Sequence, residues 1–175
     1  MRKSLNATNL RVELLSISDY THFPIDLLNK RLGIDSSFLE VEIENLLRTN
    51  YKTKYSYPIL SYVYPDRDWK DNFYHEDHIF PKSFFTPAKL RSRGYDEARI
   101  IEYRQYYNTV LNLQLLTDSE NLEKKATDFD QWIGTRDSNF KNRHNIPILP
   151  SYNFDDFINF IEERKKSLKA MLISI

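Results

Sequence analysis

The 175-residue chain is 41% hydrophobic and 29% charged, a composition typical of a globular protein with one domain and a real core. It has no cysteine, which excludes disulfides, cysteine-based zinc sites and thiol catalysis, and its three glycines form neither of the glycine-rich phosphate loops. Basic and acidic residues balance at 25 each, so contact with nucleic acid must come from a local patch. No apolar run is long enough to span a membrane, and the absence of cysteine fits a reducing compartment, so we expect a cytoplasmic protein.

The first part of the chain, residues 1–65, is predicted to be a helical lobe that serves as scaffold, because it carries no chemical motif. Ser37 and Glu40 have the spacing of a capping box, and Pro58 suits the first turn of a buried helix. The helices expected in this lobe cover residues 8–18, 24–32, 37–47 and 55–64.

The middle of the chain, residues 66–135, is predicted to be a small core with two short strands. Thr86 followed by Pro87 is typical of a helix start, and the alternation after Leu111 is typical of a strand. A helix after the second strand is expected to begin with Asp118 or Ser119 as its cap. The other expected elements are a strand over 73–80, helices over 86–94 and 95–108, a strand over 111–116 and a short helix ending at Gly134.

The last part, residues 136–175, is predicted to be a loop followed by an amphipathic helix that packs on the core. Asn153 is expected to cap this helix, whose apolar positions recur with helical spacing from Phe154 to Leu172. The whole chain is therefore predicted to have a mostly helical α+β fold.

Residues 75 to 78 read His-Glu-Asp-His, between aromatic residues and an apolar stretch where ionisable groups are expensive to bury. In a strand, His75 and Asp77 share one face, and His78 faces the other side unless the strand ends there. A carboxylate holds a hard cation such as Mg²⁺, and a neutral imidazole accepts a proton near neutral pH. The cluster therefore predicts metal-assisted hydrolysis, and a solvated charged cluster on the surface is the alternative.

A second oxygen ligand is needed, because one aspartate alone binds Mg²⁺ poorly. Asn121 offers an amide oxygen, and Lys124 lies three positions later on the same helical face, where an ammonium suits a phosphate or a leaving group.

Taken in chain order, these residues resemble a known nuclease motif. The segments DHIFPKSFF from Asp77, LNLQLL from Leu111 and ENLEK from Glu120 are similar to the HNH, or ββα-metal, nuclease finger. Over roughly residues 45–170 the chain resembles the C-terminal nuclease domain of GmrSD-like, modification-dependent restriction proteins. Over the finger alone it is also similar to the HNH domain of RNA-guided CRISPR nucleases.

The resemblance implies an HNH ββα-metal finger embedded in a helical domain, with a helical insertion over 84–108. It implies that Asp77 and Asn121 bind Mg²⁺ or Mn²⁺ and that His78 is the general base. Asn112 matches the asparagine that fixes the loop around the histidine, and Lys124 matches a catalytic basic residue near the scissile phosphate. His75 occupies a variable position, where we expect it to support the metal site or to contact substrate.

The resemblance also implies a metal-dependent endonuclease that cuts DNA in a restriction or phage-defence system, acting on foreign DNA with or without modified bases. Such proteins usually carry an N-terminal ParB-like nucleotide-using domain, whose motifs are not found in these 175 residues. We therefore expect either a stand-alone nuclease or the C-terminal piece of a larger protein, with the ParB-like part as domain or partner subunit.

A run of basic residues directly after the motif is the best candidate for contacts with the DNA backbone, and a solvated helix face is the alternative. The run has no acidic residue within it and consists of Lys82, Lys89, Arg91 and Arg93. Two other functions stay open at this point. One is a catalytically silent module that binds nucleic acid or another protein, and the other is a structural zinc site through His75 and His78.

Overall fold

The computed structural model describes residues 7–16, 27, 30, 40–64 and 72–173 of the chain. The chain divides into two compact units, Met1–Phe38 and Leu39–Ile175. In the first unit, α1 (Ala7–Ser16) agrees with the helix predicted over 8–18. The helix predicted over 24–32, apart from positions 27 and 30, and the predicted cap Ser37 lie outside the described residues.

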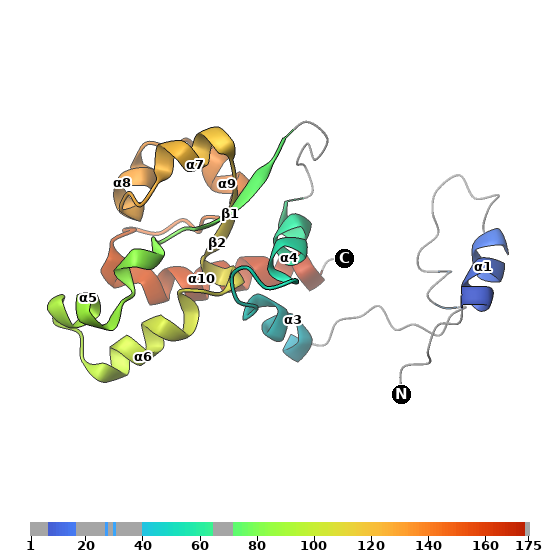
Figure 1. Ribbon diagram of the computed structural model, residues 1–175, viewed down its shortest axis with the longest axis horizontal. Helices are drawn as coiled ribbons and strands as arrows, with labels where there is room; N and C mark the ends of the chain where they lie inside the picture. Colours follow the sequence, from blue (N-terminus) through green and yellow to red (C-terminus); the bar gives the residue numbers. More distant parts are fainter. Residues whose placement is uncertain (1–6, 17–26, 28–29, 31–39, 65–71, 174–175) are drawn as a thin grey trace. The chain divides into compact units, whose positions relative to one another are not determined.

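The second unit contains a strand–strand–helix arrangement, called here the ββα unit. Strand β1 (Tyr74–His78) pairs antiparallel with β2 (Leu113–Thr117), and α7 (Asp118–Lys124) follows β2 directly and packs against both strands. Asp77 lies opposite Gln114 in the register, and His78 lies opposite Leu113. Figure 1 shows β2 leading into α7, while β1 leads into the segment that contains α5 (Pro87–Ser92).

The cap of α7 is Thr117, one residue earlier than the sequence predicted. The hydroxyl of Thr117 accepts a hydrogen bond from the Glu120 amide at 3.3 Å, and the Glu120 carboxylate accepts one from the Thr117 amide at 3.0 Å. This reciprocal capping box satisfies two amides of the first helical turn. It joins the last residue of β2 to α7 without a loop and so fixes where the helix residues lie relative to the strands.

Short helices fill the chain between the two strands, as predicted for the insertion over 84–108. Thr86 caps α5 as expected, since its hydroxyl accepts from the Lys89 amide, and Asp96 caps α6 in the same way through the Arg99 amide. Gly94 turns the chain between these helices at a φ of +86°, a conformation that suits glycine. The elements are the 3₁₀ turn Lys82–Phe84, α5 (Pro87–Ser92), α6 (Glu97–Tyr106) and the 3₁₀ turn Val110–Asn112.

Helices α3 (Glu40–Leu47) and α4 (Ser56–Val63) belong to the second unit, not to a separate lobe ending at residue 65. The reason is that their buried side chains, among them Leu47 and Leu60, join the same hydrophobic core as the strands. The unit therefore begins at Leu39, ahead of the boundary predicted at residue 66.

The C-terminal part contains one helix more than predicted. After α8 (Phe129–Gly134), the segment predicted as loop holds α9 (Ser138–Arg143), which Asp137 caps through the Phe140 amide. Asn153 makes no side-chain cap, because the 3₁₀ turn Phe154–Asp156 precedes the final helix α10 (Phe157–Ile173). No helix in the described part of the chain has the length and apolarity to cross a membrane.

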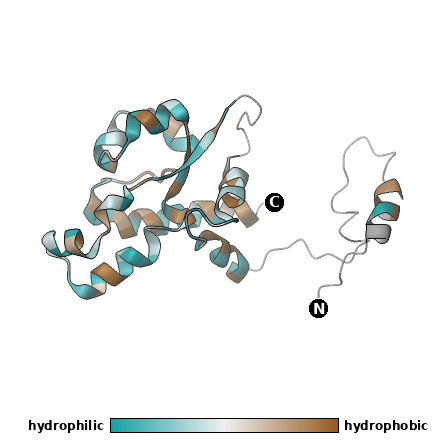
Figure 2. Ribbon diagram, viewed as in Figure 1, coloured by the Kyte–Doolittle hydropathy of each residue, from teal (hydrophilic) through white to brown (hydrophobic). Residues whose placement is uncertain are grey.

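Helix α10 is the element around which the second unit is assembled. It packs against α3, α4, α6 and the 3₁₀ turns at 110–112 and 154–156. In Figure 2, hydrophobic and hydrophilic residues alternate along α10, as expected for a helix that buries one face. The described residues thus form a mostly helical α+β fold, as the sequence predicted.

An aromatic cluster lies directly behind the end of β1. The ring of Phe80 contacts Phe129, Phe157 and Phe160, with ring centroids 4.6, 5.2 and 5.1 Å apart. Such pairs contribute about 0.5–1.5 kcal/mol each beyond the buried area. Because Phe80 follows His78 by two residues, the cluster holds the segment after the His-Glu-Asp-His motif firmly against the core.

One fully buried arginine connects α10 to the rest of the unit. Arg164 donates to the backbone carbonyl of Leu111 at 2.8 Å and to that of His144 at 3.3 Å. Burial lowers its pKa to about 10, so the guanidinium remains charged at neutral pH. The two carbonyls belong to the turn ahead of β2 and to the end of α9, and Arg164 ties both to α10.

Candidate active site

The candidate site is a cavity of about 600 Å³ along β1. Among the described strands, β1 pairs only with β2. Four consecutive residues of β1, 74–77, line the cavity together with a turn before α4 and one residue of α7. The lining residues are Tyr51, Lys52, Thr53, Tyr57, Tyr74, His75, Glu76, Asp77 and Asn121.

Asp77 reaches this cavity with one carboxylate oxygen engaged. Its Oδ2 accepts from Gln114 Nε2 at 3.0 Å and lies 2.9 Å from Lys124 Nζ. Within the described residues, its Oδ1 has no hydrogen-bond or ionic partner. The side chain is 17% exposed, so the carboxylate is held rigidly and one oxygen stays available for a ligand.

Asn121 brings a second oxygen to the same cavity from α7. Its side-chain amide forms no hydrogen bond with any other described residue, and it is half-buried. The described residues contain no cluster of three histidine or acidic side chains that could hold a metal. The oxygen pair of Asp77 and Asn121 instead fits Mg²⁺ or Mn²⁺, since Mg²⁺ is usually bound by one or two carboxylates and keeps several waters.

His78 lies at the end of β1 and is 7% exposed. Its Nε2 is 3.1 Å from Asn108 Oδ1, and the edge of its ring meets Tyr51 with centroids 4.6 Å apart. An amide oxygen can only accept, so Nε2 carries the proton and Nδ1 has the lone pair. Among the described residues Nδ1 has no partner, yet it is not a buried atom, so water reaches the basic nitrogen.

The charge state of His78 also suits a base. Burial lowers its pKa below the ordinary value of 6.5, and the positive charges of Lys82 and Lys124 act in the same direction. The hydrogen bond to Asn108 and the negative charge of Asp77 raise the pKa. Each of these effects, like the charge of each lysine, is smaller than the effect of burial. His78 is therefore neutral at physiological pH, the form that accepts a proton.

The side chain of Asn112 holds the segment that follows His78. Its Oδ1 accepts from the Phe80 amide at 3.0 Å, and its Nδ2 donates to the carbonyls of Phe80 and Tyr107 at 3.1 and 2.7 Å. The Asn112 carbonyl also accepts from the Ile79 amide at 2.8 Å. Asn112 is completely buried, so it fixes the loop after His78 and does not itself face the cavity.

Lys124 lies elsewhere than the sequence predicted. Its side chain is 1% exposed, and its ammonium contacts Asp77 Oδ2 and donates to the His78 carbonyl at 2.8 Å. An ammonium enclosed in this way has no open side for a phosphate. Lys124 was predicted to be a catalytic residue at the scissile phosphate, but it has a positioning role instead, because packing of α7 on β1 buries its whole side chain.

The remaining members of the His-Glu-Asp-His cluster have separate tasks. His75 pairs through Nε2 with Asp118 Oδ1 at the start of α7 and lines the cavity. Glu76 accepts from Ser56 Oγ at 2.8 Å and from the Lys52 amide at 3.2 Å, which attaches the turn before α4 to β1. His75 and His78 differ by an odd number of strand positions and have different partners, so they do not converge on one zinc ion.

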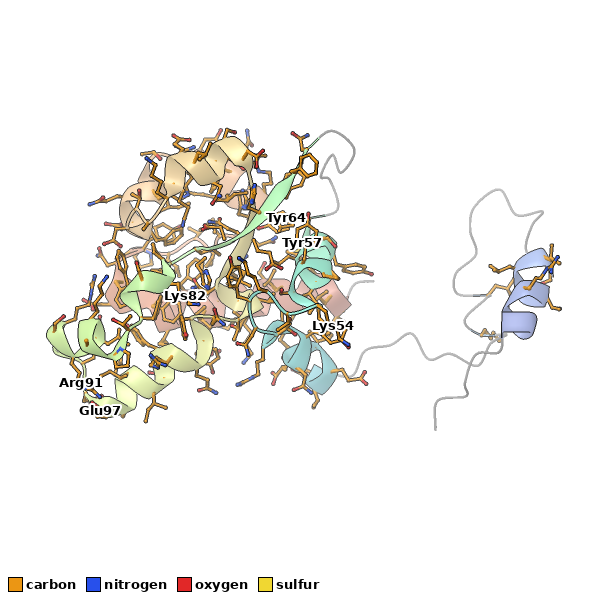
Figure 3. The ribbon with its side chains drawn as sticks, viewed as in Figure 1. Lys54, Tyr57, Tyr64, Lys82, Arg91 and Glu97 are labelled. Carbon is orange, nitrogen blue, oxygen red and sulfur yellow. The ribbon has the colours of Figure 1, made fainter. Side chains whose placement is uncertain are left out.

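The basic run after the motif is only partly available to a ligand. Arg91 pairs with Glu97 through two hydrogen bonds of 2.7 and 3.2 Å, and Figure 3 shows these two side chains together. The Arg93 guanidinium lies over the Phe154 ring at 4.4 Å, and the Lys89 ammonium lies over Phe84 at 5.5 Å. Lys82 is exposed and near enough to His78 to affect its pKa, so it is the member best placed beside the site.

Sequence reasoning missed three residues that build this site: Tyr51, Asn108 and Gln114. Gln114 carried a usable signal, since it is the one polar residue in the apolar run 111–116 apart from Asn112. Tyr51 and Asn108 meet through the bridge between Asn50 and Thr109 and a bond from the Tyr51 amide to the Asn108 carbonyl at 2.8 Å. No spacing in the sequence predicts that pairing.

Comparison with models of known protein families finds no match, and comparison with curated proteins finds none either. The interpretation of the site therefore depends on its geometry and chemistry. The structure brings Asp77 and Asn121 to one cavity. His78 is not among the residues that line this cavity, but its ring contacts Tyr51, which is one of them. The structure leaves Arg91 in an ion pair at another part of the surface.

Proposed function

We propose that the protein is a metal-dependent endonuclease of the HNH type that hydrolyses phosphodiester bonds in DNA. The observation that carries the proposal is the convergence of two distant segments. Asp77 at the end of β1 and Asn121 in α7 line one cavity, and the neutral imidazole of His78 lies next to Asp77 in the chain. An oxygen pair suited to a hard cation, beside a base, favours hydrolysis of a phosphate ester.

In this mechanism each residue of the chain has one role. His78 Nδ1 takes a proton from water as the water oxygen attacks phosphorus in line, the bond from phosphorus to the 3′ oxygen breaks, and the departing 3′ oxygen takes up a proton from solvent. Asp77 and Asn121 would hold a divalent cation, which would supply positive charge to offset the charge on the phosphate and the leaving oxygen. Lys124 and Gln114 hold Asp77, and Asn108 sets the tautomer of His78.

The resemblance supports a wider proposal about biological role. We propose action on foreign DNA in restriction or phage defence, with modified bases and a ParB-like domain or subunit as further proposals of the same origin. The cytoplasm is the compartment in which such an enzyme meets DNA.

A plasmid-nicking assay tests the proposed function directly. We expect cleavage with Mg²⁺ or Mn²⁺ on plain DNA or on glucosylated DNA, and EDTA should abolish it without changing Tm. Cleavage stops because the cation is lost, whereas Tm stays because the core does not depend on the site. Unfolding by EDTA would indicate structural zinc, and binding of DNA without cleavage under any of these conditions would indicate a silent binding module.

Replacing Lys82 by alanine is expected to weaken DNA binding and to reduce the slope of log affinity against log salt by about 1. Lys82 is exposed beside His78, whereas Arg91 is already neutralised by Glu97, so Arg91→Ala should change the slope less. Fluorescence anisotropy over a salt series measures both variants. Equal slopes for Lys82→Ala and the unaltered protein would exclude a phosphate contact by Lys82.

A further inference from the structure

The turn before α4, residues 51–55, and the first residues of α4 form part of the cavity lining. They contribute Tyr51, Lys52, Thr53 and Tyr57 to the lining, while Asp77 and Asn121 form other parts of the same lining. The turn is fixed in this place, because Glu76 holds the Lys52 amide and the Ser56 hydroxyl. Lys52 has a φ of +57°, which is uncommon for a residue with a side chain and is maintained by these contacts.

Aromatic rings from two elements line the cavity. Tyr57 comes from α4 and is 38% exposed, and Tyr74 comes from β1. Figure 3 labels Tyr57 on α4 and Lys54 on the turn that precedes it. Rings that keep exposed surface in a cavity beside a phosphate-cleaving site are suited to stack against nucleobases, whose faces are all aromatic.

The turn also carries two lysines that form no ion pair with an acidic side chain of the described residues. Lys52 and Lys54 are exposed, and within the described part of the chain their ammonium groups lie over the rings of Tyr51 and Tyr55, at 5.2 and 4.7 Å, not in ion pairs. By contrast, Arg91 of the basic run is paired with Glu97. Basic residues interleaved with tyrosines are the composition that binds the backbone and bases of a single strand.

The size of the cavity is suited to a single unpaired nucleotide. Its volume of about 600 Å³ falls within the range of roughly 300–1,000 Å³ that is typical of small-molecule sites. A duplex keeps its bases stacked inside the helix, so a base enters such a cavity only after it has left the stack. An unpaired nucleotide needs no such step.

We infer that the cavity is a subsite for an unpaired nucleotide next to the scissile phosphate, so that the substrate is DNA with a single-stranded segment at the cleavage point. The inference rests on the proposed nuclease function and names its substrate class. Tyr57 stacks against the base, and Lys52 neutralises a neighbouring phosphate.

Two tyrosines of α4 provide a matched test. Tyr57 lines the cavity, whereas Tyr62 is 51% exposed on the same helix and does not. Binding is measured by anisotropy with a labelled single-stranded oligonucleotide and with its duplex, in protein that carries His78→Ala so that no strand is cut. Tyr57→Ala should weaken single-strand binding roughly 5- to 100-fold and duplex binding little, while Tyr57→Phe and Tyr62→Ala stay near the unaltered affinity.

The same tyrosine variants, made in protein that retains His78, test the nucleotide subsite and the nuclease activity separately. If the unaltered protein cuts gapped or single-stranded DNA in preference to duplex, and Tyr57→Ala removes this preference, the subsite is supported. If DNA is cut but Tyr57→Ala and Tyr62→Ala behave alike at an unchanged Tm, the subsite is refuted and the nuclease stands. If no DNA is cut but Tyr57→Ala selectively weakens single-strand binding, the nuclease is refuted and the nucleotide-binding cavity stands.

Discussion

Replacing His78 with alanine is expected to slow DNA cleavage by roughly 10²- to 10⁴-fold, the usual contribution of a general base, with little change in DNA affinity. In the proposed mechanism the imidazole removes the proton from water, and its Nδ1 is the nitrogen without a partner among the described residues. Single-turnover cleavage under excess enzyme measures the chemical step. His75→Ala is the matched control, because His75 lies in the same strand but pairs with Asp118, and its loss should be much smaller.

Near-normal cleavage by the His78→Ala protein would contradict the assignment of the base. The dependence of the cleavage rate on pH tests the assignment independently, because the direction of the pKa shift of His78 predicts where the rate falls. The pKa of folded His78 lies below 6.5, mainly because of burial, and the charges of Asp77, Lys82 and Lys124 also act on it. The active, neutral form is therefore present at pH 6.5 and is lost only as pH falls through the lower folded pKa, so the acid limb of the rate profile lies below 6.5.

Burial of neutral His78 has the corresponding effect on stability. Between the folded pKa and 6.5 the unfolded chain binds a proton that the folded protein does not, so the contribution of His78 to stability falls as pH drops through this window. The His78→Phe protein should lose less stability as pH drops through this window. Urea denaturation at several pH values gives the comparison.

Replacing Lys124 with methionine is expected to lower the free energy of unfolding by about 3 kcal/mol, the lower end of the range for removing one partner of a buried ion pair. The ammonium is buried against Asp77 Oδ2 and the His78 carbonyl, and both lose a partner. The lower end applies because Asp77 retains Gln114 and is 17% exposed. Urea denaturation measures the loss, and Lys125→Met, at the exposed neighbouring position, should be nearly neutral.

A double-variant cycle separates this positioning role from a phosphate contact. In Asp77→Asn protein no carboxylate is left uncompensated, so Lys124→Met should cost less there than in the unaltered protein. A contact with the scissile phosphate predicts the opposite pattern, in which Lys124→Met weakens DNA binding at full stability. That result would restore Lys124 to the catalytic role predicted from the sequence.

The ββα unit could be predicted from the sequence because its signals are local. The alternation in 111–116 and the polar helix start at residues 118 and 119 act within a few residues. The same is true of the proline after Thr86, which predicted the start of α5 in the insertion. Helix α9 was missed because it is six residues long, polar, and buries only Phe140 among its residues. Its stability comes from packing and from the Asp137 cap, and its hydrophobic periodicity is too weak to predict it.

The sequence drew attention to the residues proposed as ligands and base, but not to their surroundings. Asp77, His78 and Asn121 stood out because two oxygen ligands and a base in this order have a chemical meaning. The enclosure of Lys124 and the contact of Asn108 with His78 depend on which surfaces of the fold meet. Long side chains such as lysine reach either solvent or a buried carboxylate, and the helical spacing of Lys124 predicts its face but not what covers that face.

The buried guanidinium of Arg164 limits how far the chain can be shortened. It donates to the Leu111 carbonyl just ahead of β2, so the last helix supplies a bond that the β1–β2 hairpin lacks when it is cut out alone. A fragment trimmed to residues 66–135 would expose that carbonyl and the Phe80 ring to water. We therefore expect the excised ββα unit to remain unstructured, and the shortest fragment that folds by itself to extend from the start of α3 through α10.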